Sequence, residues 1–292
     1  MTCARYLRLF TVGTARLDKL LPPDADTERY GRPVATALLL SLDAAQRAHP
    51  AGLAALALTL AALLDPAGHP RSLWTRPSVL EHLNTHRTPT PDTDHTRVDA
   101  EDAHAVLRLL HRYGLITDDA RNDPRAVRIH ALTARAARET TPDTELPALA
   151  HTAADALFGL WPEHDHTDAD LAAVLRANTD ILATHAGDLL WHTDSHPVLY
   201  RVGQSLFDTG FHGASINHWE RTTVDAERLL GTEHPHTVTA RANLAVSYQH
   251  AGRTGEAIAP QERVLVDGER LLGTEHPSTV DVADVLRKWM SE

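Results

Sequence analysis

Histidine is abundant in this chain, and closely spaced histidines are its first candidates for metal chemistry. The sequence holds 20 histidines among 292 residues. His82 and His86 lie four residues apart in an expected helix, so both imidazoles fall on one helical face. Glu81 precedes this pair, and no His-Glu-x-x-His motif is formed. We expect no metal ion at this pair.

A second histidine-rich stretch, Pro162–Asp170, combines two histidines with four acidic residues. It lies between two expected helices, and its composition is typical of a solvated loop with Asp168 near a helix N-cap. His234 and His276 occur in two copies of Thr-Glu-His-Pro. We interpret both as part of a turn. The sequence therefore predicts no metal site.

The motifs of nucleophilic and phosphate chemistry are missing from the sequence. No Gly-x-Ser-x-Gly elbow occurs, and none of the 15 glycines is followed by lysine. Without a Gly-x-x-x-x-Gly-Lys-Ser/Thr loop, there is no P-loop lysine and no backbone cradle for phosphates. We expect no catalytic residue, no cofactor and no ATP hydrolysis by this chain alone.

Charge and hydropathy argue against nucleic-acid and membrane partners. The formal net charge is −11 with the histidines neutral, which opposes general attraction to nucleic acid or anionic lipid. The longest apolar run, Leu53–Leu64, is too short to span a bilayer and predicts a buried helix. Met1–Leu20 carries charges typical of an amphipathic helix and lacks a signal-peptide core. The single cysteine, Cys3, is compatible with a reducing cytoplasm, the expected location.

The strongest pattern is an internal repeat near the C-terminus. The nine residues Glu227–Pro235 recur as Glu269–Pro277, with a shift of 42 residues. A fixed period of this size indicates stacked structural units, each burying its apolar face against the next.

Each period predicts helix, turn and helix. Gly231 and Gly273 can adopt the left-handed conformation that ends a helix. Pro235 and Pro277 fit the first turn of the next helix, where the missing N–H is not needed. A second helix is expected over residues 256–272.

These residues resemble the tetratricopeptide repeat family, in its bacterial and kinesin-light-chain-like version with longer helices. The signature positions are Leu244, Ala245, Tyr248 and Ala257. Arg241 and Gln261 depart from the family, which usually has bulky apolar residues there. The preceding unit is degenerate, and the following unit has only its first helix, Ser278–Met290. The resemblance implies a concave face that binds a protein or peptide.

The middle of the chain has the pattern of a winged helix. A helix over Ala100–Tyr113 is followed by two short strand-like runs, 115–117 and 127–129, and by a helix over 131–139. Trp74–His86 supplies an expected earlier helix. From Arg97 to Thr140 there are eight arginines and seven acidic residues, a net charge of 8 − 7 = +1. Because a winged helix that binds DNA usually carries a clear stripe of basic residues, we do not expect nucleic acid as the partner.

Tyr113–Thr117 together with Val127–Leu132 resembles the winged-helix segment of STAND-class regulatory ATPases with an NB-ARC module. In that family a histidine at the matching place senses the nucleotide's phosphates, and His130 occupies that place here. The aspartate that commonly follows is replaced by Ala131. The preceding helical stretch also resembles that family, so the chain is similar to its C-terminal portion without the P-loop domain.

We therefore expect an all-α chain with a helical bundle, a winged helix with a small two-stranded wing, and a short tetratricopeptide-like α-solenoid. The expected boundaries are 1–70 for the bundle, 71–140 for the winged helix, 141–195 for connecting helices and 196–292 for repeats of period 42. The expected role is a non-catalytic signalling module that binds a protein or peptide, with a nucleotide-binding domain in trans as a further partner. The alternatives are a winged-helix DNA-binding regulator with a repeat sensor, and a truncated inactive fragment of a STAND ATPase.

Overall fold

The computed structural model describes residues 34–89, 97–192 and 194–291. The helix expected over Met1–Leu20, with Cys3, lies outside these ranges.

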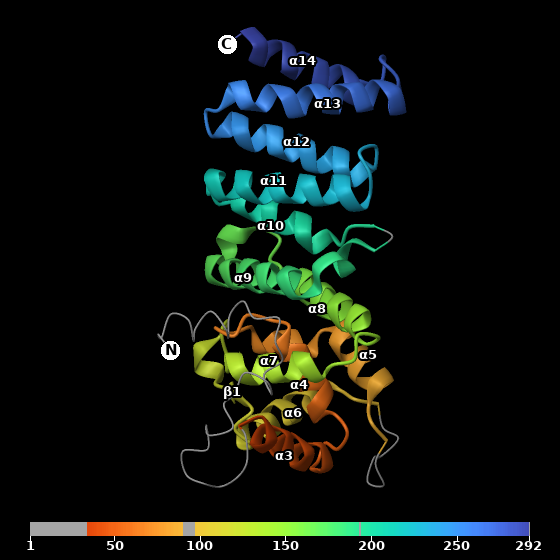
Figure 1. Cartoon of the computed structure of the whole chain (residues 1–292). Coiled ribbons are helices and arrows are strands. Elements are labelled where there is room, and N and C mark those ends of the chain that lie inside the picture. The colour runs from red at the N-terminus through yellow and green to blue at the C-terminus, as the bar shows by residue number, and fades with distance from the viewer. Residues whose placement is uncertain (1–33, 90–96, 193, 292) are drawn as a thin grey trace, which may run out of the picture. The chain divides into compact units, whose positions relative to one another are not determined.

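Regular structure in the described residues is almost entirely helical, as the sequence predicts (Figure 1). The α-helices are α3 (Val34–Arg47), α4 (Ala54–Ala62), α5 (Pro77–His86), α6 (Ala100–Arg112), α7 (Ala131–Thr140), α8 (Leu146–Leu160), α9 (Ala169–Ala186), α10 (Pro197–Asp208), α11 (His212–Leu229), α12 (Pro235–His250), α13 (Thr254–Leu272) and α14 (Pro277–Ser291). Short 3-10 helices are η1 (Arg71–Thr75), η2 (Ala120–Asn122), η3 (Asp165–Thr167) and η4 (Gly187–Trp191). The strands are β1 (Ile116–Asp118) and β2 (Val127–Ile129).

The chain divides into two compact units. The first consists of the described residues of 1–160 together with 173–186, and the second of 161–172 together with the described residues of 187–292. Helix α9 begins in the second unit and continues into the first.

In the first unit, α6 begins and ends where the sequence predicts. The Asp99 carboxylate accepts hydrogen bonds from the backbone N–H groups of Glu101 and Asp102, at 2.8 and 3.0 Å. In turn, the Asp102 carboxylate accepts a hydrogen bond from the Asp99 N–H. This reciprocal capping box satisfies donors that an isolated helix start leaves unpaired. Gly114, with a φ of +68°, ends the segment in the left-handed region.

The two strands form the expected hairpin. They pair antiparallel, with Ile116 opposite Ile129 and Asp118 opposite Val127. In β2, Val127 and Ile129 are buried, while Arg128 between them is exposed. This alternation fixes the register, because a slip of one residue would turn the buried side chains to solvent.

The single helix expected over Trp74–His86 is wrong, because the structure divides it into η1 and α5. Pro77 is the cause. The residue before a proline is disfavoured in helical conformation, and Arg76 adopts an extended conformation with φ −68° and ψ 144°. Pro77 then starts α5, where its missing N–H is harmless.

A buried histidine lies in the core of the first unit. The His69 side chain is fully buried, and Nε1–H of Trp74 donates to its Nε2 at 3.2 Å. Burial lowers the pKa of His69 to about 3. The imidazole is therefore neutral in the folded chain at ordinary pH.

Because an unfolded histidine titrates near pH 6.5, acidification protonates His69 in the unfolded chain first. The free energy of unfolding should therefore fall as the pH drops below 6.5, and level off near pH 3. The expected loss from His69 alone is about 2 kcal/mol between pH 8 and pH 5. Urea unfolding of wild type and of His69→Gln at both pH values measures it, because glutamine keeps an acceptor for Trp74 but does not titrate. Equal pH dependence in the two proteins would contradict this assignment.

Candidate functional site

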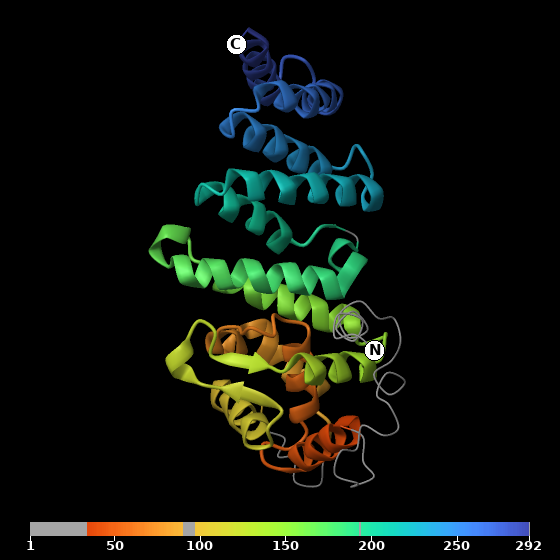
Figure 2. The ribbon, with the colours of Figure 1, turned by 60° about the vertical axis from the view of Figure 1, so that its left-hand side comes forward.

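In the second unit, α10 to α14 follow one another, and each lies beside the next (Figures 1 and 2). Their side chains meet in one apolar cluster that spans α11 to α14. The cluster consists of Ile216, Trp219, Ala240, Leu244, Ala245, Tyr248, Ala257 and Trp289, with Tyr200 packed against it. The four signature residues named from the sequence, Leu244, Ala245, Tyr248 and Ala257, all belong to it.

The two glycines and two prolines of the repeated motif lie at the turns between helices. Gly231 has a φ of +97° and Gly273 a φ of +94°, so both occupy the region that disfavours any residue with a Cβ. Pro235 and Pro277 are the first residues of α12 and α14. Each turn therefore ends one helix and starts the next within a few residues.

Histidines cap the helices that follow these turns. The Nδ1 atoms of His234 and His276 accept from the N–H groups of His236 and Ser278, each at 3.3 Å. His196 caps α10 in the same way, through the N–H of Val198 at 3.2 Å. The ring nitrogen replaces the side-chain oxygen that normally fills this role.

The cap at His196 reveals a unit boundary that the 42-residue period does not show. His196 precedes Pro197, just as His234 precedes Pro235, and the two histidines are 234 − 196 = 38 residues apart. The first repeat of the array, from His196 to His234, is therefore four residues shorter than the second repeat, from His234 to His276, because 276 − 234 = 42. The recurring His-Pro pair marks residue 196, where the repeats are expected to begin, and it also shows that the spacing of the units is not constant.

A small residue is required where α10 and α11 pack. At Gly203 of α10, an added Cβ would overlap the indole ring of Trp219 on α11. Trp219 is only 1% exposed. Gly203 thus lets the two helices approach closely in the unit whose sequence is most degenerate.

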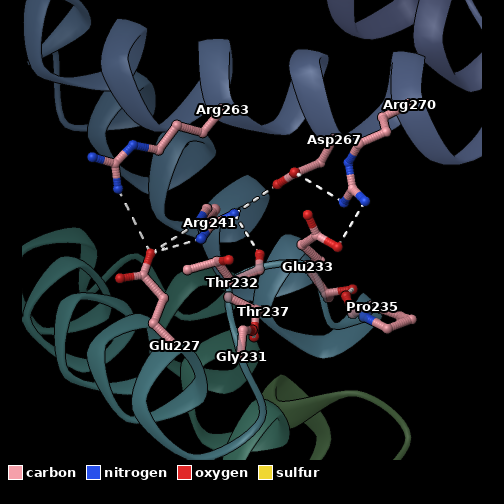
Figure 3. Close-up of polar contacts among 11 residues, drawn as sticks. Glu227, Gly231, Thr232, Glu233, Pro235, Thr237, Arg241, Arg263, Asp267 and Arg270 are labelled. Atoms are coloured by element: carbon pink, nitrogen blue, oxygen red, sulfur yellow. Dashed lines mark hydrogen bonds and ion pairs between the residues drawn. The ribbon is translucent and has the colours of Figure 1, made fainter.

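A buried arginine joins three consecutive helices of the array (Figure 3). Arg241 of α12 is 4% exposed. Its Nε donates to Oε1 of Glu227 on α11 at 3.0 Å, and its Nη1 donates to Oδ2 of Asp267 on α13 at 2.6 Å. Nη1 also donates to the backbone carbonyl of Thr232, in the turn between α11 and α12, at 2.9 Å.

The same turn has further polar anchors. The hydroxyl of Thr237 donates to the carbonyl of Gly231 at 2.7 Å, and Arg270 pairs with Glu233 at 2.7 Å. Arg270 also approaches Asp267 at 3.6 Å, which connects this pair to the Arg241 network. The turn is therefore held by side chains from both α12 and α13.

The Arg241 network explains one departure from the family pattern. An apolar residue would fill this space by packing, whereas arginine fills it with a guanidinium whose charge is balanced by two carboxylates. The position 42 residues later is Ala283, so the second copy of the turn has no such anchor. The other departure, Gln261, is buried as well, and its Oε1 has no hydrogen-bond partner among the residues that the structure describes.

His130 lies in the first unit, at the start of α7. Its Nδ1 accepts from the N–H of Leu132 at 3.2 Å, so it caps this helix, and its side chain is exposed. In the same unit, the rings of His82 and His86 lie 4.4 Å apart. Burial lowers the pKa of His82 to about 4, with a smaller effect from His86.

The loop Pro162–Asp170 is less solvated than its composition suggests. Asp168 accepts from the N–H of Leu171 at 3.0 Å near the start of α9, where the sequence placed an N-cap. Asp165, however, is 4% exposed and contacts both Arg201 and Ser205 of α10. The interpretation as a fully solvated loop is therefore wrong at Asp165, because a basic partner lies 36 residues away in sequence.

A serine, a histidine and an aspartate meet near the start of α12, but not as a catalytic triad. Ser195 Oγ contacts Nδ1 of His236, and Asp194 Oδ1 is 2.8 Å from the same nitrogen. A triad needs the nucleophile and the carboxylate on opposite nitrogens of the ring. Burial raises the pKa of Tyr200 to about 12, and its hydroxyl donates to the carbonyl of His236 at 2.9 Å. The arrangement orients His236 without activating Ser195.

One stripe of α12 is left uncovered by α11 and α13. Its members are Thr239, Ala242, Asn243, Val246 and His250, which are half-buried or exposed and follow the spacing of one helical face. We call them the α12 stripe. Ring contacts join both ends of α12 to α10: Tyr200 lies 5.4 Å from His236, and Phe207 lies 4.8 Å from His250. The two helices therefore run in the same direction and present adjacent surfaces.

If the Arg241 network holds the turn, Arg241→Met should lower the free energy of unfolding by about 2–3 kcal/mol, because two carboxylates each lose the basic group nearest to them. This is below the usual value for a fully buried pair, since the Glu227 and Asp267 side chains are 28% and 14% exposed. Arg263→Met is the matched control. Arg263 lies 3.7 Å from the same Glu227 but its side chain is 69% exposed, so its loss should change stability by less than about 0.5 kcal/mol. Urea unfolding compares the two variants, and equal losses would contradict the proposed anchor.

No described helix is both long and apolar enough to cross a membrane. No curated protein and no solved structure matches the chain. Residues 194–265 match the family model described as tetratricopeptide repeat. The matched segment covers α10, α11, α12 and the first part of α13. Within residues 194–265, the chain therefore contains tetratricopeptide repeats.

Proposed function

We propose that this chain is a non-catalytic module that binds a protein or peptide partner on the surface formed by α10 and the α12 stripe. The observation that carries the proposal is the uncovered α12 stripe within the segment that matches the repeat family. Tetratricopeptide repeats are generally protein-interaction modules, and repeat arrays bind on extended surfaces formed by equivalent helices.

The chemistry of this surface suits a polypeptide ligand. Val246 is 38% exposed and offers an apolar contact, while Asn243 can both donate and accept hydrogen bonds with a peptide backbone. On α10, Gln204 and Asp208 are exposed and bonded to each other at 2.7 Å. A mixture of apolar, amide and acidic groups is typical of a transient protein interface.

The finer proposal is that partner binding is relayed to a nucleotide-binding domain in trans, in the cytoplasm. It is supported by the hairpin and helices around His130, which resemble the winged-helix segment of STAND proteins. His130 is exposed, so a docking domain could reach its imidazole. In this proposal, His130 contacts the phosphates of a nucleotide bound to the docking domain and stabilises the inactive state of that domain.

The charges on α6 favour this role over DNA binding. Arg108 of α6 pairs with Glu101 at 2.6 Å, and the helix also carries Asp102 in its first turn. A helix that reads DNA needs cationic side chains available for phosphates. We therefore propose a protein partner for this region as well.

Val246→Glu should abolish partner binding, because it adds a charge to the α12 stripe. Val246 is exposed, so the fold should tolerate the change. Val224→Glu is the matched control, since Val224 is 63% exposed on α11, outside the stripe. Tagged wild type and both variants are incubated with lysate of the native host, and captured proteins are identified by mass spectrometry.

We expect the same specific protein with wild type and Val224→Glu, and its loss with Val246→Glu. A P-loop ATPase among the proteins that behave this way would support the relay. Equal capture by all three proteins, or no specific capture by wild type, would contradict the proposed surface.

A further inference from the structure

Potential metal ligands cluster at the first turn of α12. Among the residues that the structure describes, Asp194, His234 and His236 each offer one ligand atom, and these atoms lie within 4.8 Å of one another. Asp194 Oδ1 lies 2.8 Å from Nδ1 of His236 and 3.9 Å from Nε2 of His234. Ligand atoms around tetrahedral Zn²⁺ are separated by about 3.3 Å, given bonds of about 2.0–2.1 Å. Small side-chain rotations would therefore bring all three onto one ion.

Neighbouring groups orient two of these side chains. The N–H of Ser195 donates to Asp194 Oδ1 at 2.9 Å. The Tyr200 hydroxyl holds the carbonyl of His236 at 2.9 Å, and its ring packs against the imidazole. Metal sites typically have such neighbours, because groups that contact the ligand side chains set the orientation of those side chains. Ser195 Oγ, which contacts His236 Nδ1, lies where it could supply a further oxygen.

Helix capping does not account for His236. The second copy of the turn has Ser278 at the equivalent position, and His276 caps α14 there with the same 3.3 Å bond that His234 makes. A cap therefore needs only the first histidine. His236 is therefore an additional feature of the first copy of the turn.

We infer that Asp194, His234 and His236 bind one divalent first-row transition metal ion, with Zn²⁺ as the representative case. Two imidazoles and one carboxylate are a ligand set that such ions accept, and the remaining position stays open to water or Ser195. Zn²⁺ at Nε2 of His234 would place that ring's proton on Nδ1, which removes the cap bond to the His236 N–H. Loss of the cap costs about 1 kcal/mol, and metal–ligand bonding must exceed it.

The ion would join two parts of the repeat array. Asp194 precedes α10, whereas both histidines lie at the start of α12. A shared ion therefore links two consecutive units beside the ring contact of Tyr200 with His236. This inference is independent of the identity of any protein partner.

The test is isothermal titration calorimetry of the full, untagged, chelator-treated chain with ZnCl₂. We expect a site of one ion per chain, weakened at least about 10-fold by Asp194→Asn and by His236→Ser. The second substitution copies the residue found at Ser278. His276→Ala is the matched control, since it removes the equivalent capping histidine outside the cluster, and it should bind Zn²⁺ as wild type does.

Thermal unfolding gives a second readout. Zn²⁺ should raise the Tm of wild type and of His276→Ala, but not of His236→Ser, because only proteins that bind the ion when folded are stabilised. Circular dichroism establishes that each variant is folded. Absence of a one-to-one site in wild type would overturn the inference, as would a site of unchanged affinity in both cluster variants, which would assign the binding to other histidines.

Discussion

The repeat array depends on how the chain reverses between α11 and α12. Gly231 must take a positive φ there, and the carbonyls it leaves exposed must find donors. The Thr237 hydroxyl donates to the carbonyl of Gly231, and the Arg241 guanidinium donates to the carbonyl of Thr232. Because Arg241 also pairs with carboxylates on α11 and α13, the same side chain that anchors the turn fixes α12 between its neighbours. The surface presented by α12 follows from this placement.

Much of this architecture was predictable from local patterns. The 42-residue period located Gly231, Pro235 and their later copies, because turn chemistry depends on only a few adjacent residues. The family signature located Leu244, Ala245, Tyr248 and Ala257, which all belong to the core cluster. The hairpin followed from two short strand-like runs flanking turn residues. In each case the information lies within one element or its immediate flanks.

The parts that were missed depend on contacts between distant residues or on less common chemistry. The partners of Arg241 lie 14 and 26 residues away, so its burial could not be read from its own segment. Asp165 was assigned to a solvated loop for the same reason. The histidine caps were missed because histidine is not among the usual capping residues. The division of Trp74–His86 was different, since Pro77 was visible in the sequence and its effect on Arg76 was overlooked.

The two units of the chain have different relations to function. In the second unit, the family match, the core cluster and the uncovered stripe all concern the same helices, so the proposed binding role rests on several observations. In the first unit, the proposed sensing role of His130 rests on a resemblance, while its visible contact is a cap on α7. The buried, neutral His69 gives that unit a pH-sensitive core.

Hydroxyl-radical footprinting of the full chain, with and without its captured partner, tests the central claim most directly. Oxidation of side chains, read by mass spectrometry, reports which of them become covered. The account predicts protection of Phe207, Val246 and His250, with no change at Val224 of α11 or Val266 of α13. Protection of Val224 and Val266 with none on the α12 stripe would contradict the account, and would place the binding surface on the second helices of the repeat units.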